Sequence, residues 1–167
     1  MNPMPKLFNW SGRFADLDSG HQNAIAQLIQ EGGAINGTKD EILLRLQRTR
    51  KIAVLSEHEN GRVVGVAALK TPTRNYRQKK FADAGFAITG FEEALELGYV
   101  VIHADWRGHQ LSGGLVDLIL HEITAPAFAT TDSDTMRKNL TRSGFTRVGR
   151  DWQGNKGALS LWIFMPT

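Results

Sequence analysis

The sequence predicts an α/β protein in which helices cover a mixed β-sheet. Two observations support this fold class. The Asn60-Gly61 pair lies between two apolar runs, 51–56 and 62–70, and such a pair is a strong signal of an antiparallel hairpin. After the hairpin, runs rich in Val and Ile alternate with amphipathic segments. Because 167 residues suffice for one domain with a substantial core, we expect residues 1–167 to form a single domain.

A strand and two amphipathic helices are expected before the hairpin. Ser19 followed by Gln22, and Thr38 followed by Glu41, both fit the capping box of a helix start. A glycine pair at 32–33 is expected to end the first of these helices. Both helices carry an apolar face at helical spacing, formed by Ile25, Leu28 and Ile29 in the first and by Ile42, Leu43 and Leu46 in the second.

The elements after the hairpin alternate between helix and strand. Pro72 closes the second strand of the hairpin, and a short basic helix can form up to Gly85. The expected elements are this helix over 74–85, a buried strand over 95–104, a helix over 111–123, a strand over 125–131, a helix over 134–144, and strands over 145–152 and 157–165.

Composition limits the class of protein. The apolar fraction of 41% and the charged fraction of 22% are typical of globular proteins. No apolar run approaches the roughly 20 residues that span a bilayer, and the start, MNPMPKLFNW, has no apolar stretch of signal-peptide length. Without cysteine, the chain has no disulfide or thiolate metal site, and we expect a cytoplasmic protein with no metal.

The net charge of +3 favours an anionic ligand but does not by itself indicate nucleic acid. Basic residues gather in the segment TRNYRQKK, where Arg74, Arg77, Lys79 and Lys80 form either a solvated helix face or a site for a polyanion.

The connection RGHQLSGG, residues 107–114, lies between the buried strand and the next helix. The free amides and the dipole of a helix start bind phosphate, and small residues let the backbone approach a ligand closely. The alternative is an ordinary strand-to-helix connection with incidental glycines.

This stretch, together with the strand before it, resembles the signature of the GCN5-related N-acetyltransferase (GNAT) superfamily. There, a Q/R-x-x-G-x-G/A loop at a helix start holds the pyrophosphate of acetyl-CoA. Arg107 matches the first position, Gln110 stands in place of the middle glycine, and Ser112 takes the last small position. The Gly144-Phe145 pair matches the corner that follows the family's next helix, and the hairpin resembles the family's second and third strands.

The resemblance implies a mixed, mostly antiparallel sheet of six to seven strands, flanked by four to five helices and with a splayed central strand. It also implies an acyl-CoA-dependent N-acyltransferase with acetyl-CoA as co-substrate. The residues expected to contact acetyl-CoA are Val101, Ile102, His103, Arg107, Gly108, His109, Gln110, Leu111, Ser112, Gly113, Gly114 and Ser133. Gln110 and Ser112 are tolerable in this loop if their backbone angles stay helical.

The family reaction needs a base, a donor to the developing oxyanion and a proton for the thiolate. Glu96 is the candidate base, on one strand face with Gly98, Val100 and Ile102. A structural ion pair is its alternative role. Weaker candidates are Glu92 and Glu93, with His103 as a proton relay, and the amide of Ile102 or His103 is expected to meet the oxyanion.

The general acid departs from the family pattern. Many members carry a tyrosine four residues before the glycine of the Gly-Phe pair, and that position is Leu140 here. The thiolate then takes its proton from water or from Ser133, Thr141 or Ser143.

Three functions remain open: acetylation of a small primary amine, CoA binding without catalysis, and acetylation of a protein or nucleic-acid-linked amine docked on the basic segment. The small-molecule or protein amine is preferred over nucleic acid, no membrane partner is expected, and a homodimer is open because relatives are often dimers. The sequence names neither the acceptor nor the exact acyl donor.

Overall fold

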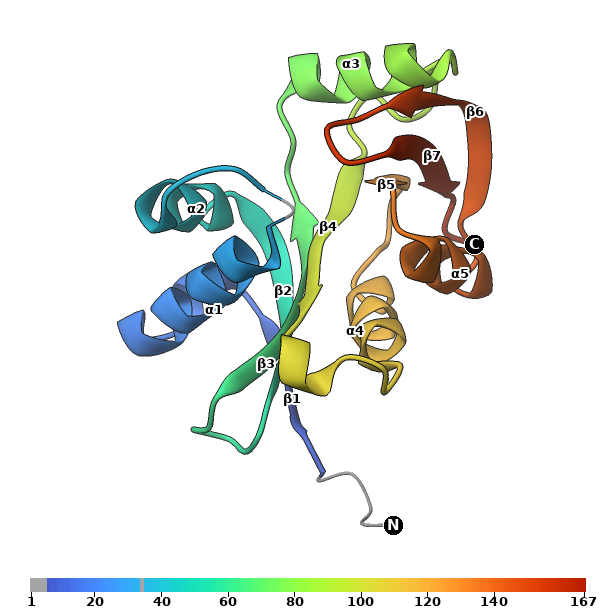
Figure 1. The fold of residues 1–167 in the computed structure, drawn as a ribbon. Helices are drawn as coiled ribbons and strands as arrows, with labels where there is room; N and C mark the ends of the chain where they lie inside the picture. The colour runs from blue at the N-terminus through green and yellow to red at the C-terminus, as the bar shows by residue number, and fades with distance from the viewer. Residues whose placement is uncertain (1–5, 34) are drawn as a thin grey trace.

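The computed structural model describes residues 6–33 and 35–167. The first five residues of the expected domain, which belong to the segment MNPMPKLFNW, therefore lie outside the described residues. In the described part, seven strands form one sheet in the order β1-β2-β3-β4-β5-β7-β6 (Figure 1). The strands are β1 (Phe8–Gly12), β2 (Thr49–Ser56), β3 (Val63–Lys70), β4 (Leu95–Ile102), β5 (Ala127–Thr131), β6 (Thr146–Gln153) and β7 (Ala158–Phe164). The α-helices are α1 (Ser19–Gly32), α2 (Lys39–Leu46), α3 (Arg74–Ala84), α4 (Leu111–Leu120) and α5 (Asp134–Arg142).

The sheet is mixed and mostly antiparallel, which confirms the expected fold class. β4 and β5 form the parallel pair, and they pair only at Leu95–Ala127 and Glu96–Phe128. Beyond Glu96, β4 leaves its neighbour, so its stretch from Gly98 to Ile102 has no paired strand on the β5 side (Figure 1).

Helices cover both faces of this sheet (Figure 1). α1 and α2 pack on one face, and α4 and α5 pack on the other, each over its own apolar cluster. The fully buried side chains at the centres of these clusters are Ile25, Ile29, Ile42 and Leu46 under α1 and α2, and Leu115, Ile119 and Leu140 under α4 and α5. None of the helices in the described ranges is both long and apolar enough to cross a membrane.

The helix ends follow local sequence signals, with one correction. Thr38 caps α2 by accepting from the Glu41 amide at 3.2 Å, as predicted. Gly33, in the left-handed region at φ 68°, closes α1. The prediction that Ser19 caps α1 was wrong, because Asp18 is extended and accepts from the His21 amide at 2.8 Å.

Arg77 holds α3 against the segment before β4. Its guanidinium is buried and donates to the carbonyl oxygens of Pro72, Glu92 and Ala94 at 3.2, 2.6 and 2.9 Å. Of the two alternatives that the sequence left for the four basic residues, a solvated helix face or a polyanion site, neither holds for Arg77. The helix is fixed beside the first residues of β4.

A bulge interrupts β4 in its middle. The register between β3 and β4 shifts between Val66 and Ala68, so two residues of β4, Tyr99 and Val100, lie opposite one residue of β3. Tyr99 adopts φ 53°, which is rare for a bulky residue.

The bulge changes which side chains share a face. Glu96, Gly98, Val100 and Ile102 were expected on one face of β4, and this was wrong because the extra residue reverses the alternation. Val100 and Ile102 pack into the cluster beneath α4, whereas Glu96 forms an ion pair with Lys70 on the other face.

A second irregularity, in β6, lets α3 pack closely. Gly149 lies in a register shift with φ 69°, and a Cβ there would collide with the carbonyl oxygen of Ala84 at the end of α3. Gly90, at φ 90°, has open space around its Cβ position. A comparison of alanine substitutions at the two positions therefore distinguishes the cost of a left-handed backbone from the cost of a steric collision.

We expect Gly149→Ala to lower the free energy of unfolding by clearly more than Gly90→Ala. The Gly90 change costs about 1–2 kcal/mol through its left-handed backbone alone, and the Gly149 change adds displacement of α3. Urea unfolding of both variants measures the difference, and equal losses would contradict the close packing of α3 on β6.

Candidate functional site

The start of α4 differs from that of the other α-helices. In α1, α2, α3 and α5 the N-cap side chain accepts a hydrogen bond from the first turn, whereas Gln110 at the N-cap of α4 makes no such bond. No described residue accepts from the backbone N–H groups of Leu111, Ser112 and Gly113. Three donors at the positive end of a helix dipole are thus without a partner among the described residues.

Gln110 itself corrects an expectation. It was expected to keep helical angles, but it adopts φ 59° and ψ 27°, in the left-handed region. Gly108, two residues before it, also has a positive φ, of 85°. The chain leaves the 3₁₀ turn Ala104–Trp106 and must reverse sharply to enter α4, and left-handed residues provide that reversal. The strained residue, Gln110, therefore stands at the position where the family pattern has glycine.

A cavity of about 450 Å³ lies at this helix start; we call it the loop pocket. Its volume suits a small-molecule ligand. Of the residues expected to contact acetyl-CoA, those that line it are Ile102, Arg107, Gly108, Gln110, Leu111, Ser112 and Ser133. These residues come from β4, the connection after it and the starts of α4 and α5, so the fold brings most of the predicted set together.

α5 supports the start of α4 from behind. The Ser112 hydroxyl accepts a hydrogen bond from the Asn139 side chain at 2.8 Å, and Asn139 is buried. A hydroxyl that accepts still has its own hydrogen to donate. A Cβ on Gly113 would collide with the Arg142 guanidinium. The analysis of the sequence missed Asn139, because a polar residue inside an amphipathic helix gives no local signal of a distant partner.

A second cavity, of about 430 Å³, lies where β4 parts from β5; we call it the splay pocket. Val100, Ser133 and Met136 line both cavities. The two pockets are therefore adjacent, and together they form a path from the start of α4 along β4 to Glu96.

Glu96 lies at the floor of the splay pocket and is only 3% exposed. Its Oε1 is 2.8 Å from Nζ of Lys70, and its Oε2 accepts from the Tyr76 hydroxyl at 3.1 Å. The Lys70 ammonium also lies over the Tyr99 ring, 4.4 Å from its centroid. The structure thus gives Glu96 the ion pair that the sequence left as an alternative, and it places that pair in a cavity.

The two partners of Glu96 both hold their protons firmly. Burial lowers the pKa of the Lys70 ammonium, but the charges of Glu96 and Tyr99 and the contact with Glu96 raise it by more, so the net pKa is above its ordinary value. Burial, and then the negative charge of Glu96, raise the pKa of the Tyr76 hydroxyl far above its ordinary value. At neutral pH, Lys70 is charged and Tyr76 is a hydrogen-bond donor.

The amides of β4 allow one expectation to be corrected. The N–H of His103 donates to the carbonyl of Val64 at 2.8 Å, so it is not available to an oxyanion and that candidate was wrong. In an antiparallel ladder the direction of the amides alternates, so the N–H groups of Ile102 and Val100 point away from β3, toward the gap left by β5. The carbonyl of Ile102 accepts from Nε of Arg107 at 3.2 Å.

Some predicted residues lie elsewhere. Val101 lines the splay pocket, and its side chain meets Gly32 of α1. Gly114 faces a separate hollow beside Leu118, and His109 is exposed and lines none of the cavities described for the chain. The rival carboxylates Glu92 and Glu93 are exposed and line neither the loop pocket nor the splay pocket.

The candidate proton donors differ in whether they line the two pockets. Leu140 is fully buried and lines the splay pocket without any group to donate. Ser133 lines both pockets, whereas Thr141 and Ser143 line neither. Ser133 caps α5 by accepting from the Met136 amide at 3.3 Å, which leaves its own hydrogen free.

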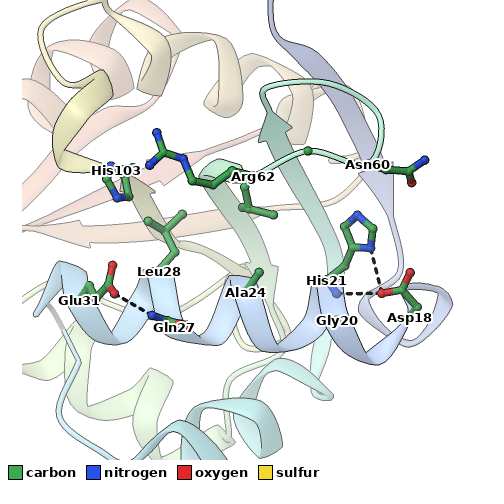
Figure 2. Close-up of a pocket in the computed structure, with 12 residues that line it drawn as sticks. Asp18, Gly20, His21, Ala24, Gln27, Leu28, Glu31, Asn60, Arg62 and His103 are labelled. Carbon is green, nitrogen blue, oxygen red and sulfur yellow. Dashed lines mark hydrogen bonds and ion pairs between the residues drawn. The ribbon is translucent and has the colours of Figure 1, made fainter.

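A larger cavity, of about 590 Å³, lies between α1 and the β2–β3 turn (Figure 2). Its polar groups mostly bond to one another: Asp18 accepts from His21, and Gln27 donates to Glu31 (Figure 2). His103 lines this cavity rather than the loop pocket. Over residues 6–33 and 35–167, no three His, Asp or Glu side chains gather closely enough to hold a metal ion.

Comparisons with known proteins identify the fold. No protein-family model and no curated protein matches the chain. Among solved structures, an acyl-CoA N-acyltransferase from Pseudomonas aeruginosa is 15% identical with a TM-score of 0.70, covering 95% of this chain and 99% of its own. A GNAT-family acetyltransferase from Streptococcus agalactiae is 12% identical with a TM-score of 0.68, covering 95% and 96%. The NatC complex bound to Gag peptide and CoA contains a chain 14% identical with a TM-score of 0.66, covering 97% and 99%. The chain therefore has the GNAT fold, as the resemblance in its sequence implied.

We expect Gln110→Gly to raise the free energy of unfolding by about 1 kcal/mol, because glycine adopts the left-handed region without the steric cost that Gln110 bears. Thermal or urea unfolding measures the change. The matched control is Gln47→Gly: Gln47 ends α2 with helical angles, so glycine there should destabilise. A loss of stability in both variants would contradict the strain at Gln110.

Proposed function

We propose that residues 1–167 form one domain of the GNAT superfamily that transfers the acetyl group of acetyl-CoA to a primary amine by direct attack. The observation that carries this proposal is the uncapped start of α4, which opens onto the loop pocket and, through the adjoining splay pocket, leads to Glu96. The likeness of fold to acyl-CoA N-acyltransferases supports the same reaction.

The start of α4 fits the pyrophosphate of acetyl-CoA. The unpartnered amides of Leu111 and Ser112, which line the loop pocket, match an anion, and the helix dipole adds to them. The Ser112 hydroxyl and the Arg107 guanidinium line the same pocket and add donors. Bound acetyl-CoA supplies an activated acetyl thioester, and its pantetheine arm would run along β4 toward the splay pocket.

Glu96 is the proposed base. As the nitrogen–carbon bond forms and the carbon–sulfur bond breaks, the amine must give up a proton and the departing thiolate must gain one. Because Glu96 is only 3% exposed, a water molecule carries the amine proton to it. Lys70 and Tyr76 fix the carboxylate at the pocket floor, so its position is set before an amine arrives.

The thioester oxygen gains negative charge during the attack. The Ile102 amide, turned into the gap beside β4, is the proposed donor, with the amide of Val100 next to it. For the thiolate, Tyr76 is a poor acid because its pKa is raised so far. Ser133, which lines both pockets, or water supplies that proton.

Two other functions receive uneven support. The buried Leu140 favours CoA binding without catalysis as the second candidate, since the family's usual proton donor is missing. Docking of a polyanion on α3 loses support, because Arg77 is buried among carbonyls and Lys79 is paired with Asp83 at 3.1 Å.

We expect acetyl-CoA to raise the melting temperature, with a stabilisation of about 2.7 kcal/mol at 100 times its dissociation constant. Ser112→Leu should abolish this shift, because a bulky side chain fills the loop pocket and removes a donor. Ser143→Leu is the matched control, since Ser143 lines neither pocket and its variant should keep the shift. No shift with the unmodified chain at millimolar acetyl-CoA would reject the proposal.

We expect Glu96→Gln to lower the rate of amine-dependent thiol release by about 100-fold or more, as for loss of a general base. The variant keeps a partner for Tyr76 but leaves Lys70 without its counter-charge, so its rate is measured well below its own melting temperature. Glu92→Gln is the control, because Glu92 is exposed and lies outside both pockets. Equal rates in Glu96→Gln and the unmodified chain would exclude Glu96 as the base, and an acetyl-CoA shift without any turnover would favour the binding domain.

A further inference from the structure

The residues that line the splay pocket carry more positive than negative charge. Lys70 and Glu96 lie 2.8 Å apart and neutralise each other at the floor. Lys80 and Lys156 also line the pocket, and Asp132 is the further carboxylate among its described lining residues. The lining thus includes three lysines and two acidic residues, an excess of one positive charge, although Lys156 and Asp132 are exposed.

Lys80, on α3, is one of the residues that line this pocket. It is half-buried, and its Nζ lies 5.1 Å from the centre of the Tyr76 ring, whose hydroxyl bonds to Glu96. Its neighbour Lys79 is exposed and paired with Asp83 at 3.1 Å, but no described carboxylate lies within ion-pair distance of Lys80. Lys80 is therefore held close to the base without a counter-charge.

Lys156 reaches the same pocket from the turn between β6 and β7. Its Nζ donates to the carbonyl of Gly33 at the end of α1, and no described carboxylate pairs with it either. Asn36 and Asn155, both exposed, line the pocket too, and a side-chain amide can donate to an anion. Donors from α3, from the segment after α1 and from the β6–β7 turn thus gather around one cavity.

We propose that the acceptor is a small amine that also carries a carboxylate, as a free amino acid does. This rests on the proposed function. The amine end lies toward Glu96, and the carboxylate end lies with Lys80 and Lys156. A plain protonated amine meets a net positive pocket with nothing to offset the repulsion, and a polyamine meets more of it. A carboxylate on the acceptor supplies the missing counter-charge.

The test uses matched acceptors that differ by a single carboxylate: β-alanine against ethylamine, 4-aminobutyrate against propylamine, and phenylalanine against phenethylamine. Thiol release with acetyl-CoA gives kcat/KM for each. The preferred acid should exceed its matched amine by about tenfold or more, since each partly exposed ion pair contributes up to about fivefold. 1,3-Diaminopropane should be poorer than propylamine.

Lys80→Gln and Lys156→Gln should each lower this acid-to-amine ratio through KM, and the double variant should bring it near unity. Lys79→Gln, on the same helix and outside the pocket, is the matched control and should leave the ratio unchanged. An unchanged ratio in the double variant would overturn the assignment of the two lysines.

A binding measurement covers the case in which none of these amines is acetylated. With CoA saturating, the acids should raise the melting temperature further than their matched amines, and less so in the double variant. Acids that do no better than amines in both measurements overturn this inference while leaving the acetyltransferase proposal intact. Absence of any acetyl-CoA shift overturns both.

Discussion

The parting of β4 from β5 is the constraint on which the site depends. The two strands pair only at their first residues, and a bulge at Tyr99 and Val100 then bends β4 away. Two amides of β4 lose a strand partner and face a cavity, which a closed sheet would not allow. The left-handed angle of Tyr99 carries a steric cost, and the ring is held in place by the Lys70 ammonium 4.4 Å above it. Lys70 therefore supports both the bulge and the carboxylate beside it.

The start of α4 shows how the proposed anion site can form without the glycine that the family pattern has there. What binds an anion is a set of backbone amides, and these persist whatever side chain the residue carries. Gln110 takes the left-handed angles that glycine would take, at a steric cost, and its side chain leaves the first turn uncapped. Asn139 and Arg142 of α5 then hold that first turn from behind, through Ser112 and against Gly113. The loop and the helix after it work as one unit.

Local signals in the sequence predicted the elements, their order and most helix ends, because caps such as Thr38 and Gly33 act within three residues. The family resemblance grouped Arg107, Gln110 and Ser112, and these three residues, which are close in sequence, line one pocket. The bulge was missed, and with it the face of Glu96, because Gly98 was taken as part of an unbroken strand and the left-handed residue itself is Tyr99, a bulky residue that rarely adopts such angles. The Glu96 cluster was missed because Tyr76 stands 20 residues away and Lys70 lies on another strand. Such pairings depend on strand register and on where α3 packs, and a local sequence pattern predicts neither.

The same cations that would repel a plain amine would also assist its reaction. A protonated amine cannot attack a thioester, and positive charge nearby favours loss of its proton. Lys70 stays charged at neutral pH, and Lys80 and Lys156 add to the positive potential over the pocket. For an acceptor with a carboxylate, the two effects divide along its length: the anionic end offsets the repulsion and holds the molecule, while the amine end lies in the positive field beside Glu96. Binding and deprotonation are then served by one arrangement of charge, which a pocket lined by carboxylates alone would not achieve because it would stabilise the unreactive ammonium.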